Sequence, residues 1–121
     1  MMISLPYPPK ELSPNARNHW AVKSTATKNY RHGCAKLAEK QGLTKIDAES
    51  LDLRVIFCPP DRRPRDRDNA IAAFKAGQDA IADVTGIDDH KFQVTYAPGW
   101  GNPIKGGAVI VEIGETPNVK G

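Results

Sequence analysis

The chain has 121 residues, which is enough for one domain with one core and too few for two. Charged residues make up 26% and hydrophobic residues 40%, a composition that excludes an intrinsically disordered chain. The formal net charge of +3 is too small to establish nucleic-acid binding by itself, so the distribution of the charges carries more information. We expect a single domain over residues 1–121, with its core at about 3–113 and a flexible C-terminal tail.

The N-terminal part predicts a short strand and a polar loop. Residues 2–5 alternate as a strand does, and the prolines that follow cannot continue a ladder of hydrogen bonds. In the loop from Lys10 to about Lys23, we assign contacts with a DNA backbone to Asn15 and Arg17. Trp20 has two interpretations: a stacking surface for bases, or an anchor that holds the loop on the core. The anchor is the favoured one.

A helix is predicted from Ser24 or Thr25 to Gly42, with a hydroxyl cap at its start and glycine at its end. Its apolar face is expected to bury four residues, Tyr30, Cys34, Leu37 and Ala38. Cys34 and Cys58 lack metal-type spacing, so we interpret them as free buried thiols in a reducing compartment. The sequence contains no signal-peptide pattern and no run of ~18 apolar residues, which indicates a cytoplasmic protein.

Three strands and one further helix are predicted in the second half. Residues 51–57 form a strand that prolines stop, and residues 92–96 and 108–113 are expected to pair as a hairpin. A continuous helix is predicted from Asp68 to Val84. On one side it buries four residues, Ile71, Phe74, Gln78 and Ile81, and on the other it exposes a polar stripe that includes Asp68, Lys75, Asp79 and Asp83.

Residues 62–69 concentrate charge of both signs where the strand gives way to this helix. Four arginines, Arg62, Arg63, Arg65 and Arg67, alternate with the carboxylates of Asp66 and Asp68. Guanidinium groups match phosphate oxygens, and grouped carboxylates bind hard cations such as Mg²⁺. Phosphate and metal in one place indicate phosphodiester chemistry. The alternative is that Asp66 and Asp68 only cap the helix.

A second carboxylate pair, Asp88 and Asp89, follows the helix and is typical, on its own, of a polar turn. The helix would be about 25 Å long at ~1.5 Å per residue, so the two pairs lie at its opposite ends. Asp89 can approach Asp66 and Asp68 only if the chain after the helix folds back along it. Sequence spacing does not show whether it does.

Five segments occur in a distinctive order: a Leu-Pro-Tyr-Pro-Pro run at 5–9 before a Ser-Pro-Asn loop, the arginine-rich element at 60–69, Ala-Ala-Phe-Lys at 72–75, Asp-Ala-Ile at 79–81 and Gly-Ile-Asp-Asp at 86–89. In this order they resemble the RusA family of Holliday-junction resolvases, often carried by phages and prophages. The resemblance covers about residues 3–113. In the best-known members a lysine stands four positions after the second aspartate of the D-x-D element, whereas here that position is Ala72 and the lysine is Lys75.

The resemblance implies a small α/β (α+β) domain, a mixed β-sheet packed by two main helices, that acts as a homodimer on four-way DNA junctions. It implies a Mg²⁺- or Mn²⁺-dependent endodeoxyribonuclease that makes paired symmetric nicks in recombination and repair. The expected catalytic residues are Asp66, Asp68, Asp89 and Lys75, and the expected metal ligands are Asp66, Asp68, Asp88 and Asp89. The expected DNA-binding residues are Arg62, Arg63, Arg65, Arg67, Arg17 and Asn15.

Two other functions remain open. A non-catalytic protein that binds branched DNA would use the aspartates only to cap the helix and to pair with arginines, so its DNA binding would be indifferent to Mg²⁺. A metal-dependent hydrolase of small phosphoesters would need an enclosed, partly apolar pocket with a stacking aromatic. The residues around the arginine-rich stretch include few aromatics with which to build one.

Overall fold

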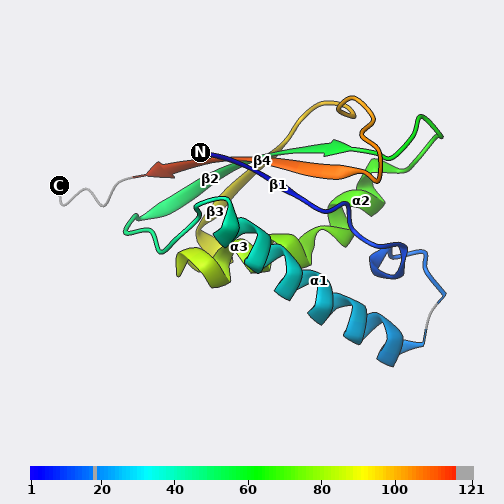
Figure 1. Ribbon diagram of the computed structural model, residues 1–121, viewed down its shortest axis with the longest axis horizontal. Coiled ribbons are helices and arrows are strands. Elements are labelled where there is room, and N and C mark those ends of the chain that lie inside the picture. The colour runs from blue at the N-terminus through cyan, green and yellow to red at the C-terminus, as the bar shows by residue number, and fades with distance from the viewer. Residues whose placement is uncertain (18, 117–121) are drawn as a thin grey trace.

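The computed structural model describes residues 1–17 and 19–116 and shows helices packed on one face of a sheet (Figure 1). The four strands are β1 (Met2–Leu5), β2 (Ser50–Cys58), β3 (Phe92–Tyr96) and β4 (Ala108–Thr116). The helices are α1 (Trp20–Lys40), α2 (Arg67–Ala73) and α3 (Lys75–Thr85), with short 3₁₀ turns η1 (Lys10–Leu12) and η2 (Asp89–Lys91). The predicted α+β class, a mixed sheet with two main helices, is confirmed.

The strands lie in the order β1-β4-β2-β3, with β2 parallel to β3 and the other pairs antiparallel. The predicted hairpin of residues 92–96 with 108–113 is therefore wrong, because β3 and β4 lie on opposite sides of β2. Helices α2 and α3 cross over the sheet between β2 and β3, which is the usual way to connect parallel strands. The connection at 97–107 then crosses the end of β2, where the Gly101 amide donates to the Phe57 carbonyl at 2.8 Å.

The core fills the space between the helices and one face of the sheet. Alternate residues of β2 are buried there, from Leu51 to Phe57, while Asp52 and Arg54 are exposed on the opposite face. Strand β4 continues through Thr116, so 114–116 belong to the sheet rather than to the predicted tail. The rest of that tail, 117–121, lies outside the described residues. In the part of the chain that is described, no helix has the length and apolar character needed to cross a membrane.

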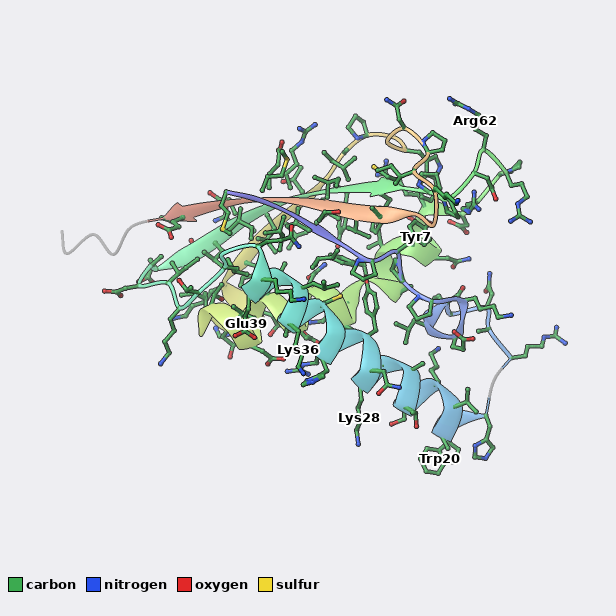
Figure 2. All side chains as sticks on the ribbon, in the orientation of Figure 1. Tyr7, Trp20, Lys28, Lys36, Glu39 and Arg62 are labelled. Carbon is green, nitrogen blue, oxygen red and sulfur yellow. The ribbon has the colours of Figure 1, made fainter. Side chains whose placement is uncertain are left out.

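Helix α1 starts earlier than predicted. His19 is its N-cap, and the Nδ1 atom accepts a hydrogen bond from the Ala21 amide at 3.1 Å. The predicted hydroxyl cap is wrong because this imidazole satisfies the first turn, which leaves Ser24 inside the helix. Trp20 is 75% exposed and points away from the domain, so the anchor interpretation is also wrong (Figure 2). Leu37, predicted to be buried, is exposed as well.

The predicted helix 68–84 is divided into α2 and α3 at Phe74, whose backbone has φ −81° and ψ −2°. Phe74 is fully buried, and its ring covers Gly77 so closely that a Cβ atom there would overlap it. The break keeps the apolar and polar residues on opposite sides, as predicted. Phe74 and Ile81 are buried as predicted, Ile71 and Gln78 are only half-buried, and Lys75 and Asp83 are exposed.

Candidate active site

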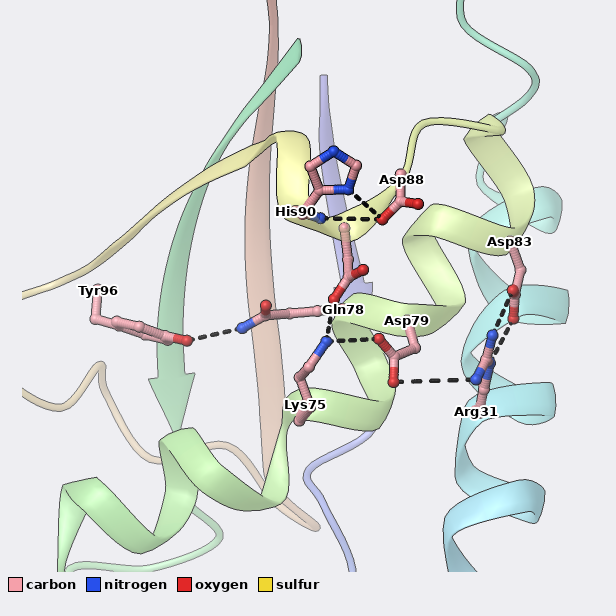
Figure 3. Close-up of polar contacts among 9 residues, drawn as sticks. Arg31, Lys75, Gln78, Asp79, Asp83, Asp88, His90 and Tyr96 are labelled. Atoms are coloured by element: carbon pink, nitrogen blue, oxygen red, sulfur yellow. Dashed lines mark hydrogen bonds and ion pairs between the residues drawn. The ribbon is translucent and has the colours of Figure 1, made fainter.

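The chain folds back after α3 and brings Asp89 to Lys75. Gly86 ends the helix in the left-handed conformation, with φ +77°, and its amide donates to the Ala82 carbonyl. The following residues return along α3, so that η2 contacts that helix and Asp89 approaches Lys75 (Figure 3). The Lys75 ammonium group donates to Oδ2 of Asp89 and to Oδ1 of Asp79, the latter at 2.8 Å. Two residues predicted for the site, far apart in sequence, thus contact each other.

Lys75 is a surface cation held by two carboxylates. Its side chain is 55% exposed, against 27% for Asp79 and 38% for Asp89. Partial burial lowers the pKa of Lys75, but the hydrogen bonds to Asp79 and Asp89 outweigh that effect and raise the pKa above its ordinary value. The ammonium group is therefore charged at neutral pH and accessible to a ligand. The sequence predicted Asp79 on the exposed stripe, but no role in the site was assigned to it. Its position one turn after Lys75 is the spacing expected of an ion pair on a helix surface.

Arg31 of α1 connects this cluster to the neighbouring helix. Its guanidinium group makes two hydrogen bonds of 2.7 Å to the Asp83 carboxylate and approaches Asp79 at 4.0 Å (Figure 3). The hydrogen bond to Asp83 raises the pKa of Arg31, and the same bond lowers the pKa of Asp83. Arg31 of α1 thus offsets part of the negative charge of Asp79 and Asp83 on α3. Asp89, which lies outside the helix, is the second carboxylate that contacts Lys75.

Asp88 does not face Lys75. It caps η2, accepting from the His90 amide at 3.2 Å and lying 2.8 Å from the His90 imidazole. These hydrogen bonds lower the pKa of Asp88 to about 2. The polar-turn interpretation therefore describes Asp88, while its neighbour Asp89 has a different environment.

Asp66 and Asp68 lie at the start of α2. Asp66 is the N-cap, accepting from the Asp68 amide at 2.9 Å, and Asp68 is exposed in the first turn. The described residues show no hydrogen bond or ion pair between this pair and Lys75 or Asp89. Within 1–17 and 19–116, no group of three or more His, Cys, Asp or Glu side chains is placed to hold a metal ion. Capping thus explains Asp66, and the four predicted metal ligands are not assembled at one point.

The arginine-rich loop is ordered by its own carboxylate, Asp61, which was not among the predicted site residues. Asp61 pairs with Arg63 at 2.9 Å and with Arg65 at 2.8 Å, and these hydrogen bonds, that from Arg63 foremost, hold its pKa well below the usual range. Arg67 donates to the Ala97 carbonyl at 2.7 Å. Arg62 is exposed, projects from the loop and has no such partner among the described residues (Figure 2). Arg65 and Arg67 therefore shape the loop, while Arg62 and the mostly exposed Arg63 face solvent.

The remaining predicted contacts lie before α1. Arg17 and Asn15 are both exposed, and the Asn15 amide donates weakly to the Ser13 hydroxyl at 3.4 Å. Both side chains are available to a ligand at the surface.

Comparison with known proteins finds a relative but no family. No family model matches the chain. An uncharacterized protein of Xylella fastidiosa (strain Temecula1) is 43% identical over 93 residues, which cover 74% of this chain and 61% of the relative. The chain therefore spans about three fifths of the length of this curated relative.

Proposed function

We propose that the protein is a RusA-like, Mg²⁺-dependent endodeoxyribonuclease that resolves four-way DNA junctions. The observation that carries the proposal is the contact of Lys75 with Asp89. A cation and an anion from separate segments meet at the surface, where a phosphodiester can reach them. This pair forms only because the chain folds back after α3. An ion pair as exposed as this one contributes little to the stability of the fold, so stabilisation alone does not account for it.

Lys75 is proposed to bind the scissile phosphate. Its ammonium group is charged and more than half exposed, so it can offset negative charge that develops on the phosphate oxygens. Asp79 and Asp89 hold the group in place until a phosphate competes for it. In this step the two carboxylates only position the Lys75 ammonium group, and Lys75 itself contacts the phosphate.

Metal binding is proposed for Asp66, Asp68 and Asp89, with Asp88 as a further ligand. All offer carboxylate oxygens, the donors that Mg²⁺ and Mn²⁺ accept. Mg²⁺ commonly keeps several waters and takes only one or two carboxylates together with substrate phosphates, so the proposed ion does not need all four carboxylates at one point. When bound, the ion would supply Lewis acidity and an activated water.

DNA binding is proposed for the exposed arginines and the loop before α1. Arg62 and Arg63 would contact phosphates directly, and Arg65 and Arg67 would hold the loop that presents them. Arg17 and Asn15 would extend the contact. A homodimer with two-fold symmetry would place one site on each of two opposed strands of the junction. We assign this activity to the bacterial cytoplasm, where Cys34 and Cys58 would remain reduced.

Specific observations also favour one alternative function, a DNA-binding protein without nuclease activity. Asp66 caps α2, and Asp61 pairs with two arginines, which is the arrangement expected of a DNA-binding protein without nuclease activity. The two functions differ in their dependence on metal.

A strand-scission assay separates them. The wild type and Asp68→Asn are incubated with a mobile four-way junction or a linear duplex, in Mg²⁺, Mn²⁺ or EDTA. Nicks paired across the junction that require metal and disappear in Asp68→Asn support the nuclease. Tight binding of the junction with no scission in either metal would establish the DNA-binding alternative.

A further inference from the structure

A small pocket lies between the arginine-rich loop and the connection from β3 to β4. Its volume is about 220 Å³, and its walls include Pro59, Arg62, Arg63, Trp100 and Asn102. None of the proposed catalytic or metal-binding residues lines it. The pocket is therefore separate from the Lys75 cluster.

We propose that this pocket binds one unpaired nucleotide of DNA, with the base against the Trp100 ring and the phosphate at Arg62. The inference deepens the proposed function and rests on it for the identity of the polymer, because a four-way junction that opens at its crossover exposes unpaired bases. The volume is below the ~300–1,000 Å³ typical of drug-sized ligands, which suits a single base better than a larger ligand.

Trp100 is held firmly enough to act as a stacking surface. It is 37% exposed and contacts the buried Phe57 ring in a T-shaped pair, with the ring centroids 6.3 Å apart. The next residue, Gly101, donates to the Phe57 carbonyl at 2.8 Å. A Cβ atom at Gly101 would lie 2.7 Å from the Cys58 sulfur, so glycine permits this close approach. The indole is thus fixed at the wall of the pocket with part of its surface open.

Asp61 and three arginines, Arg62, Arg63 and Arg65, line the pocket, and Arg62 is the arginine among them that Asp61 does not engage. Asp61 pairs with Arg63 and Arg65, whereas Arg62 has no hydrogen bond or ion pair within the described residues. The exposed amide of Asn102 supplies both donors and an acceptor for the edge of a base. An aromatic ring beside a free arginine is the usual basis for binding single-stranded nucleic acid with little sequence preference.

The test compares two oligonucleotides with the same number of phosphates, hexathymidylate and an abasic hexamer. In a Trp20→Phe background, Trp100 is the remaining tryptophan, and its fluorescence reports directly on the pocket. We expect hexathymidylate to quench this fluorescence and the abasic hexamer to leave it unchanged. Unchanged fluorescence with both, at concentrations that saturate binding, would overturn the inference.

Variants then measure the contributions of the ring and the charge. Because stacking of one base is commonly worth ~5- to 150-fold in affinity, Trp100→Leu should weaken hexathymidylate binding at least about fivefold and leave abasic binding unchanged, and Trp100→Phe should retain most of the affinity. Arg62→Gln should weaken both oligonucleotides, whereas the matched control Arg54→Gln, on the exposed face of the sheet, should weaken neither. Equal weakening of both oligonucleotides by Trp100→Leu would contradict base stacking.

The same proteins distinguish the failure of this inference from the failure of the proposed function. If Trp100 is quenched by bases but no metal supports junction cleavage, the pocket stands and the nuclease does not. If the junction is cleaved but Trp100→Leu and wild type bind both hexamers alike, the nuclease stands and the pocket does not.

Discussion

Lys75 in the first turn of α3 pairs with Asp89, which follows the end of the same helix. The contact exists because Gly86 reverses the chain and η2 returns beside α3 (Figure 3). A helix alone would separate these residues by most of its length. The crossover from β2 to its parallel neighbour β3 imposes the return, so the topology of the sheet positions the candidate site.

Two glycines in the helices should respond oppositely to alanine. Gly77→Ala is expected to destabilise the protein by about 1–3 kcal/mol, because its Cβ atom would overlap the buried Phe74 ring. Gly33 in α1 has open space where a Cβ atom would stand, with no neighbouring atom within 4 Å, so Gly33→Ala should stabilise by about 0.5–1 kcal/mol. Urea unfolding of both variants measures the two changes. Equal effects at the two positions would show that the Phe74 ring does not restrict position 77.

The Arg31–Asp83 pair should couple α1 to α3 only weakly. Both side chains are nearly half exposed, so solvent screening limits the pair to about 1 kcal/mol or less despite its two short hydrogen bonds. A double-mutant cycle with Arg31→Gln and Asp83→Asn gives the coupling free energy. It should decrease as salt is raised. A coupling of about 3 kcal/mol or more that is insensitive to salt would indicate that the pair is shielded from solvent.

Stability should fall at alkaline pH through Cys34. This thiol is fully buried, and burial raises its pKa from 9.0 to about 11. Because the folded state favours the protonated thiol, its contribution is complete below pH 9 and is lost as pH rises toward 11. Urea unfolding of wild type and Cys34→Ala between about pH 8 and 11 should show a shallower decline in the variant. Parallel declines would assign the alkaline sensitivity to other groups, such as Tyr30, whose pKa burial also raises.

Periodicity predicted most of the elements. Residues 2–5, 51–57 and 92–96 form strands as expected, and the opposite faces of the helix at 68–84 were assigned correctly around Phe74 and Lys75. These predictions depend on side-chain alternation within one element, which the sequence displays directly. The position of Lys75 on an exposed face follows from the same rule.

Contacts between elements were harder to predict. The place of β4 beside β2 depends on a loop path that local patterns do not encode. The pairing of Asp61 with two arginines and the His19 cap join residues two to four positions apart, yet they depend on side-chain geometry that the order of residue types does not show. The spacing of Lys75 and Asp89 in the sequence is compatible with their contact only if the chain folds back, and it does not reveal the fold that achieves this. Asp79, one turn from Lys75, could have been included from its spacing alone.

The most direct test of the proposed active site is the single-turnover rate of junction cleavage in Mg²⁺ by Lys75→Gln and Asp89→Asn. Lys36→Gln on α1 and Asp52→Asn on the exposed face of the sheet are matched controls that remove the same charges elsewhere. We predict a loss of at least about 100-fold in the first two variants, with junction affinity within a few-fold of wild type and unchanged rates in the controls. Wild-type rates in Lys75→Gln and Asp89→Asn would contradict the assignment of the active site to this pair.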